Sequence, residues 1–150
     1  MPLTCDEPIA DLCQPVRLKL VNRELASTRN CNKILVIDDD PFSCIGLKIR
    51  LKANYYDPWF AHDAEAAISA ALTERPDLII LDIGLPGHDG YFVMQRLSAL
   101  PELADVPVIV LTAREGIAHE RRCRDAGAKR FFEKPVHNRL LLGAIRQLVG

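Results

Sequence analysis

The sequence predicts an α/β fold in which five parallel strands form one sheet with helices on both faces. Five predicted strands alternate along the chain with five segments whose apolar residues recur at helical spacing. Three of the strands, over 34–37, 78–81 and 106–111, are apolar throughout, which is typical of strands buried on both faces. Strands that alternate with helices are joined by right-handed crossovers, so the sheet is expected to be parallel.

Composition limits the classes of function. The chain has 150 residues, 49% of them hydrophobic, and a net charge of −1. This length suits one domain with a tail. The charge gives no reason to expect nucleic-acid binding, and no apolar run is long enough to span a bilayer. The N-terminus lacks the basic and apolar regions of a signal peptide, so we expect a cytoplasmic protein.

The chain has five cysteines, and their spacing matches no C-x-x-C metal or redox pattern. We expect reduced thiols, as is normal in the cytosol. Cys44 and Cys123 fall in predicted helices and are expected to be small core residues. The other three are Cys5, Cys13 and Cys31.

Residues 1–32 lack the regular pattern of the rest and are interpreted as an N-terminal extension. It is either a flexible leader or carries a short helix between Pro15 and Ser27. The domain itself is predicted to span residues 33–150.

In the first half of the domain, strands are predicted over 34–37, 56–61 and 78–81, and helices over 41–53, 64–73 and 91–99. Asp40 and Asp63 are suited to cap the first two helices. Pro58 cannot donate a hydrogen bond to a neighbouring strand, so the strand 56–61 should lie at a sheet edge. We expect Ile45 and Ile49, with Leu47 and Leu51 beside them, to form the apolar stripe of the first helix.

In the second half, strands are predicted over 106–111 and 130–133. A helix over 117–126 should end at Gly127, a residue common after helix C-termini. The last helix is expected to run from His137 or Asn138 to Val149. Its apolar stripe is predicted to contain Leu140, Leu141, Ala144, Ile145 and Leu148.

Polar residues end every predicted strand but the second. Asp38 and Asp39 follow the first strand, Asp82 the third, Thr112 the fourth and Lys134 the fifth. Taken singly, each has an ordinary explanation as a helix cap or a turn residue. In a parallel sheet, however, these ends share one edge, where ligand sites lie.

Three clustered carboxylates would raise one another's pKa unless a cation neutralises them, and carboxylate oxygens suit Mg²⁺. Such a cluster with a lysine is equipped for phosphoryl transfer, because the cations neutralise phosphoryl oxygens while one carboxylate attacks phosphorus. The sequence has no P-loop pattern, so nucleotide binding is not indicated.

The strand ends with their flanking residues resemble the receiver domain of two-component response regulators. The similarity covers about residues 33 to 150. It is carried by four motifs: ILVIDDDP over 34–41, LDIGLPGHDG over 81–90, VLTA over 110–113 and FFEKP over 131–135. The resemblance implies a flavodoxin-like, doubly wound sheet with strand order 2-1-3-4-5 and five helices.

The resemblance also implies a role for each carboxylate. Asp82 would accept a phosphoryl group from a sensor histidine kinase or a histidine phosphotransfer protein. Asp38, Asp39 and Asp82 would hold Mg²⁺, together with the backbone carbonyl of Gly84. The chain would act as a phosphoacceptor in a phosphorelay rather than as an enzyme, apart from self-dephosphorylation.

The remaining implied roles concern the response to phosphorylation. Lys134 would pair with the phosphoryl oxygens, and Thr112 would hydrogen-bond them. Phe131 matches the switch aromatic of the family, where Tyr is frequent, so one hydroxyl contact is lost. Gly84 and Arg114 stand at positions that influence dephosphorylation in the family. The fourth helix, fifth strand and fifth helix would present the signal to an unidentified downstream protein.

Other interpretations remain open. No output module follows Gly150, so we expect either a stand-alone receiver or a fragment of a longer regulator. Another interpretation is a receiver that only binds partners and is not phosphorylated. An aspartate-nucleophile phosphatase is an alternative from another class, because Asp38-Asp39-Asp40 contains Asp-x-Asp after an apolar strand. In phosphatases of that class a Thr or Val is expected two residues after the second Asp of the motif, where this chain has Phe42.

Overall fold

The computed structural model describes residues 31–85, 90–113 and 117–149. The chain divides into two units, residues 1–31 and 32–150, and the second contains all the helices and strands described. The helix predicted between Pro15 and Ser27 lies outside the described residues, as do Cys5, Cys13 and Arg114.

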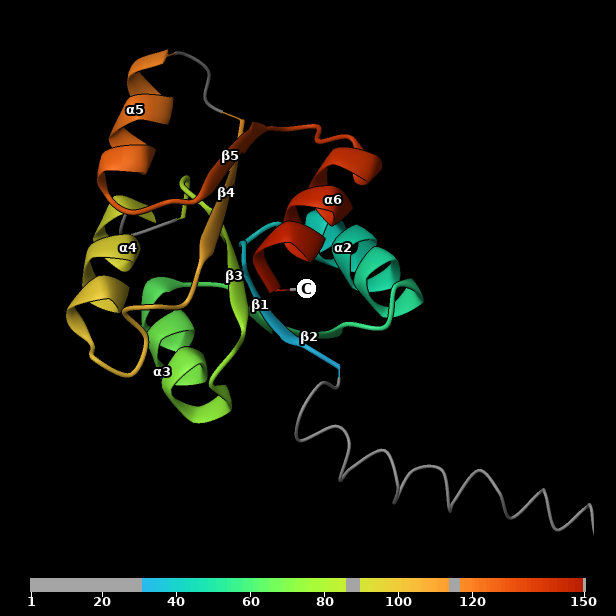
Figure 1. The fold of residues 1–150 in the computed structure, drawn as a ribbon, viewed down its shortest axis with the longest axis horizontal. Coiled ribbons are helices and arrows are strands. Elements are labelled where there is room, and N and C mark those ends of the chain that lie inside the picture. Colours follow the sequence, from blue (N-terminus) through green and yellow to red (C-terminus); the bar gives the residue numbers. More distant parts are fainter. Residues whose placement is uncertain (1–30, 86–89, 114–116, 150) are drawn as a thin grey trace, which may run out of the picture. The chain divides into compact units, whose positions relative to one another are not determined.

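A single sheet of five parallel strands forms the centre of the domain (Figure 1). Its order is β2-β1-β3-β4-β5, which confirms the predicted fold class and strand order. The strands are β1 (Lys33–Ile37), β2 (Asp57–Ala61), β3 (Leu78–Asp82), β4 (Val108–Thr112) and β5 (Arg130–Glu133). Ile37 pairs with Leu81, and Asp82 with Leu111, so the C-terminal strand ends are level at one edge.

Two layers of helices cover the sheet (Figure 1). The helices are α2 (Pro41–Ala53), α3 (Ala64–Glu74), α4 (Gly90–Ala99), α5 (Ile117–Asp125) and α6 (Asn138–Val149). One core cluster joins α3, α4 and α5 to one face of the sheet, and a second joins α2 and α6 to the other. Successive strand residues alternate between these cores: Leu35 and Ile37 belong to the first, Ile34 and Val36 to the second.

The predicted helix caps are confirmed. The Asp40 side chain accepts a hydrogen bond from the Phe42 amide at 3.0 Å, and the Asp63 side chain accepts one from the Ala66 amide at 2.8 Å. Gly127 follows α5 with a φ of 109°, a value that favours glycine, and its amide donates to the Arg124 carbonyl. Local side-chain chemistry therefore fixes where these helices begin and end.

The predicted edge position of the second strand is also confirmed: among the described strands β2 comes first in the sheet order, pairs only with β1 and contains Pro58. The fourth strand starts later than predicted, at Val108 instead of Val106. The Val106 amide donates to the Leu103 carbonyl at 3.1 Å, so Val106 belongs to a turn and the strand begins after it.

The predicted apolar stripe of α2 is partly wrong. Ile45 and Ile49 are 56% and 64% exposed, whereas the residues facing the sheet are Cys44, Leu47 and Leu51. Both sets recur at helical spacing on opposite sides of α2, so spacing alone does not decide which set is buried. Packing against α6 and the sheet selects the set that contains Leu47 and Leu51.

A smaller correction concerns α6. Leu140 is 60% exposed, while Leu141, Ala144 and Ile145 are buried. Leu140 lies at the margin of the apolar stripe, which is centred nearer Leu141 and Leu148. Cys44 and Cys123 are buried as predicted, and Cys31 is exposed. Among the described residues, the structure contains no helix of the length and apolarity that crossing a membrane requires.

Candidate functional site

The polar residues at the strand ends lie where the parallel topology predicts. Asp38 follows β1, Asp82 ends β3, Thr112 ends β4 and Lys134 follows β5. Asp38 and Thr112 are the buried polar residues of the domain's described part. The Lys134 amide donates to the Thr112 carbonyl at 2.8 Å, which joins the segments that follow β4 and β5. The structure thus places these predicted site residues at one edge of the sheet.

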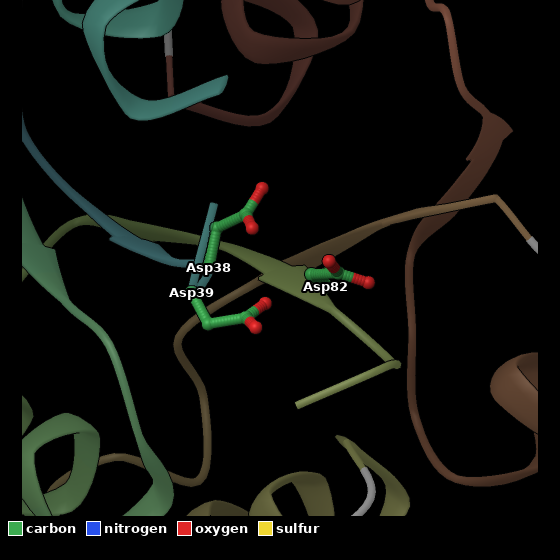
Figure 2. Close-up of side chains that lie close together, drawn as sticks. All are labelled: Asp38, Asp39 and Asp82. Atoms are coloured by element: carbon green, nitrogen blue, oxygen red, sulfur yellow. The ribbon is translucent and has the colours of Figure 1, made fainter. Parts of the chain in front are cut away.

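Three carboxylates form the centre of this edge. Asp38, Asp39 and Asp82 each offer an oxygen atom, and these oxygens lie within 4.8 Å of one another. Figure 2 shows the three side chains beside one another at the ends of β1 and β3. Asp38 is buried, Asp82 is partly buried and Asp39 is exposed, so the cluster opens to solvent on the Asp39 side.

Lys134 supplies the positive charge of the cluster. Its Nζ lies 2.8 Å from Asp38 Oδ2 and 3.3 Å from Asp82 Oδ2. Burial lowers the pKa of Lys134, but its hydrogen bond to Asp38 and the charges of both carboxylates outweigh this and raise it overall. Lys134 is therefore positively charged at neutral pH and offsets part of the negative charge of the three carboxylates.

Asp82 is held at both oxygens. Its Oδ1 accepts a hydrogen bond from the Gly84 amide at 2.9 Å, and its Oδ2 faces Lys134. Burial raises the pKa of Asp82 above its usual value, and the charge of Asp38 adds to this. The Gly84 amide and Lys134 act in the opposite direction. The pKa is raised overall because burial raises it more than the Gly84 amide and Lys134 lower it.

Asp38 is fixed by contacts to its side chain and its backbone. Its Oδ1 accepts a hydrogen bond from the Asp40 amide at 2.9 Å. Its carbonyl oxygen lies 2.9 Å from His62 Nδ1 and 3.5 Å from Cys44 Sγ. Burial, with the charges of Asp38 and Asp40, raises the pKa of the Cys44 thiol to about 11, so this thiol remains protonated at neutral pH.

Sequence reasoning missed the contribution of His62. The second strand was the one strand for which no polar residue at its end was singled out. His62 directly follows β2, and its ring Nδ1–H can donate to the Asp38 carbonyl. The rule that selected the other residues, a polar side chain after a strand, would have found it.

The donor set of this edge fits Mg²⁺. Three carboxylates that share one opening provide hard oxygen ligands, and the exposed Asp39 leaves room for the waters that Mg²⁺ retains. The role predicted for the Gly84 carbonyl stays a prediction; the observed contact of Gly84 is made by its amide. Phe131 lies in β5, opposite Val110, and packs against the core formed with α3, α4 and α5.

Comparisons with known proteins agree with this geometry. A family model described as the response regulator receiver domain matches residues 34–146. The response regulator PleD of Caulobacter vibrioides is 34% identical over 116 residues, which cover 77% of this chain and 26% of PleD. The response regulator MprA of Mycobacterium avium is 35% identical over 117 residues, or 78% of this chain and 50% of MprA. This chain therefore spans about a quarter to a half of the length of these relatives.

Solved structures of response regulators and receiver domains have a similar fold. A putative response regulator from Chloroflexus aurantiacus superposes with a TM-score of 0.76 at 28% identity, covering 80% of this chain and 98% of that one. The receiver domain of the sensor histidine kinase PA1611 from Pseudomonas aeruginosa superposes with a TM-score of 0.74 at 27% identity, with the same coverage. That structure has a magnesium ion coordinated in its active-site cleft.

Proposed function

Because the chain belongs to the response regulator receiver domain family of two-component signalling, we propose that Asp82 accepts a phosphoryl group. Receiver domains of this family are generally phosphoacceptors in signalling rather than classical enzymes. The observation that carries the proposal is the position of Lys134 Nζ, which contacts Asp38 and Asp82 together in a cluster of three carboxylates.

In the proposed reaction, a carboxylate oxygen of Asp82 attacks the phosphorus of a phosphohistidine on the donor. The new P–O bond forms as the P–N bond breaks, and the imidazole leaves with the electron pair and is then protonated. Lys134, which contacts Asp82 Oδ2, would pair with the phosphoryl oxygens, and the Gly84 amide, which contacts Asp82 Oδ1, would keep the carboxylate in one orientation. Asp38, Asp39 and Asp82 would hold Mg²⁺, which when bound supplies further positive charge for the phosphoryl oxygens.

The consequence of phosphorylation is a local change of charge. The modification adds roughly 1.5 to 2 negative charges and three acceptor oxygens at the end of β3. We propose that Thr112 and Lys134 follow these oxygens and that the packing of Phe131 shifts with them. A shift of this kind requires that the phosphoryl group interact differently with the two arrangements.

The donor is proposed to be a sensor histidine kinase or a histidine phosphotransfer protein. An exposed aromatic side chain, Phe42 in the first turn of α2, lies next to the site, which supports docking of a protein rather than only of a small phosphodonor. It borders a hollow of about 330 Å³ between α2 and residues 134–136, lined by Phe42, Ser43, Gly46, Leu47, Arg50, Leu111, Lys134, Pro135 and Val136. The expected cytoplasmic location stays a prediction.

Phosphorylation by acetyl phosphate tests this function. With Mg²⁺ present, intact-mass measurement should show one added phosphoryl group on the full chain. Asp82→Asn should abolish the addition, whereas Asp105→Asn, which changes an exposed carboxylate outside the cluster, should leave it unchanged.

Three outcomes would contradict the proposal. Labelling of the Asp82→Asn variant would show that another residue is the acceptor. Wild-type protein that remains unlabelled with several donors would indicate a receiver that only binds partners. Repeated release of phosphate from many small esters would indicate a phosphatase.

A further inference from the structure

A backbone carbonyl beside the carboxylate cluster is held by a side chain. The Asp38 carbonyl oxygen lies 2.9 Å from His62 Nδ1. Because a carbonyl oxygen has no proton to give, the ring nitrogen must be the donor, so Nδ1 carries the hydrogen. The Cys44 thiol lies 3.5 Å from the same oxygen, and a thiol is a weaker donor than an imidazole N–H. The hydrogen bond from His62 is therefore the stronger of these two contacts.

This ring continues the hydrogen bonding between β1 and β2 beyond the end of β2. The Asp38 amide donates at 3.1 Å to the carbonyl of Ala61, the last residue of β2. In the regular pattern of parallel strands, the Asp63 amide would be the next donor to the Asp38 carbonyl. Asp63 instead caps α3, where its side chain accepts a hydrogen bond from the Ala66 amide. At this position the His62 ring supplies a donor to the carbonyl.

The backbone on both sides of His62 is fixed. Before it, the Ala61 carbonyl accepts the hydrogen bond from Asp38, and after it the Asp63 carbonyl accepts one from the Ala67 amide at 2.9 Å. His62 therefore lies between the end of a strand and the cap of a helix. Side chains placed by such elements are held more precisely than those on loops, so the ring is in position before any ligand binds.

The carbonyl that His62 contacts belongs to the peptide bond between Asp38 and Asp39. A peptide bond is planar, so fixing its oxygen also fixes the direction in which the chain enters Asp39. The Asp38 carboxylate has further contacts, to Lys134 Nζ at 2.8 Å and to the Asp40 amide at 2.9 Å. Among the residues that the structure describes, none forms a hydrogen bond or ion pair with the Asp39 carboxylate. The orientation of Asp39 therefore depends mainly on its backbone.

His62 acts on the cluster through this backbone and not as a further metal ligand. In the described part of the chain, the side chains that together could hold a metal ion are Asp38, Asp39 and Asp82, and His62 is outside this group. Its Nδ1 is already engaged by the Asp38 carbonyl. A change at His62 should therefore affect metal binding only through the carboxylates.

We propose that His62 is a positioning residue of the Mg²⁺ site. Its Nδ1–H holds the peptide between Asp38 and Asp39, so that the exposed Asp39 carboxylate stays beside those of Asp38 and Asp82 (Figure 2). Groups that hydrogen-bond behind metal ligands typically change metal affinity by roughly 10- to 100-fold when they are removed. The inference rests on the Mg²⁺ site of the function proposed above.

The Mg²⁺ affinity of the full chain, measured by titration calorimetry without a phosphodonor, tests the proposal. His62→Leu removes the donor and should weaken Mg²⁺ binding roughly tenfold. His62→Asn keeps an N–H donor on a short side chain and should restore most of the affinity. Asn54→Leu is the matched control, because it also removes a side-chain donor to a backbone carbonyl, that of Arg50 at 2.9 Å. This control lies at the C-terminal end of α2 and should leave Mg²⁺ affinity unchanged.

A double-mutant cycle separates this role from a general effect on folding. In an Asp39→Asn background, His62→Leu should weaken Mg²⁺ binding little further, because the carboxylate that His62 positions is already absent. Nitrogen NMR of the neutral imidazole in metal-free wild-type protein gives an independent measurement. It should show hydrogen on Nδ1 and none on Nε2. This measurement requires no variant to fold.

Several results would overturn the proposal. These are equal Mg²⁺ affinity of the wild type and His62→Leu, equal weakening by His62→Leu and His62→Asn, or an effect of His62→Leu that is the same with and without Asp39→Asn. A neutral ring with its hydrogen on Nε2 would also overturn it. Wild-type protein that binds no Mg²⁺ would contradict the metal site itself and this inference with it. Protein that shows the expected affinities but takes no phosphoryl group would support the role of His62 and contradict only the proposed function of Asp82.

Discussion

Lys134 Nζ lies 2.8 Å from Asp38 Oδ2, so an ion pair joins residues that are 96 positions apart in the sequence. The pair connects the segment after β1 with the segment after β5, across the C-terminal edge of the sheet. Asp38 is almost fully buried and depends on this contact for its charge partner. The same lysine faces Asp82, so one side chain serves both the stability of the domain and its proposed chemistry.

Replacement of this lysine should separate stability from metal binding. Lys134→Met leaves the buried Asp38 without this cation, and we expect a loss of about 3 to 5 kcal/mol in the free energy of unfolding without metal. Mg²⁺ should bind more tightly to the variant, because a competing positive charge is gone. Urea unfolding with EDTA and with Mg²⁺ measures both effects. Lys48→Met, on an exposed position of α2, is the control and should change stability little. Equal losses in the two variants would contradict the role of the ion pair.

Magnesium should stabilise the domain through the carboxylate cluster. At about 100 times its dissociation constant, a ligand that binds only the folded state adds about 2.7 kcal/mol of stability. Asp39→Asn should lose most of this gain, because the variant removes a proposed and exposed Mg²⁺ ligand while the fold is preserved. Without metal, the same variant should be as stable as the wild type or slightly more so, because repulsion among the carboxylates decreases. Thermal unfolding during a Mg²⁺ titration measures the difference, and an unchanged gain would exclude Asp39 from the site.

Two glycine substitutions should change stability in opposite directions. A Cβ atom at Gly90 would lie 2.6 Å from Ile83 Cα and 2.9 Å from Ile83 Cδ1, so Gly90→Ala should destabilise the fold by about 1 to 3 kcal/mol. A Cβ atom at Gly143 meets no atom within 4 Å. Gly143→Ala should therefore stabilise α6 by about 0.5 to 1 kcal/mol, because Ala has the higher helix propensity. Chemical denaturation measures the free energy of unfolding of both variants. Changes of equal size and sign, or changes with the opposite signs, would refute this account.

Truncation of aliphatic residues should identify the buried side of α2. Leu47→Ala and Leu51→Ala remove buried groups and should each cost about 2 to 5 kcal/mol. Ile45→Ala and Ile49→Ala remove exposed groups and should change stability by no more than about 0.5 kcal/mol. Urea midpoints of the four variants decide between this packing and the stripe expected from sequence. Large losses for the isoleucines would restore the sequence-based expectation.

Sequence alone was sufficient for the order of the elements, the parallel sheet and its edge strand. Runs such as 34–37 and 78–81 are apolar throughout, and caps such as Asp63 act within one helical turn, so these signals are local. The position of polar residues after strands was also readable, because parallel topology places all such ends at one edge. Asp38, Asp82 and Lys134 could therefore be grouped from the sequence, and the structure places them in contact.

Only the tertiary structure decided which residues of α2 face the core, that His62 contacts the Asp38 carbonyl and that Arg122 of α5 stacks on Tyr91 of α4. Helical spacing describes both sides of α2 equally well, and the choice between them depends on the surfaces of the sheet and of α6. Charged residues that are close in the sequence can have different partners in the fold: Arg122 stacks on the Tyr91 ring, whereas Arg124 pairs with Glu120. The sequence by itself determined the helices, the strands and their caps, because these depend on local interactions. The partners of the side chains were decided by the long-range packing of the helices on the sheet.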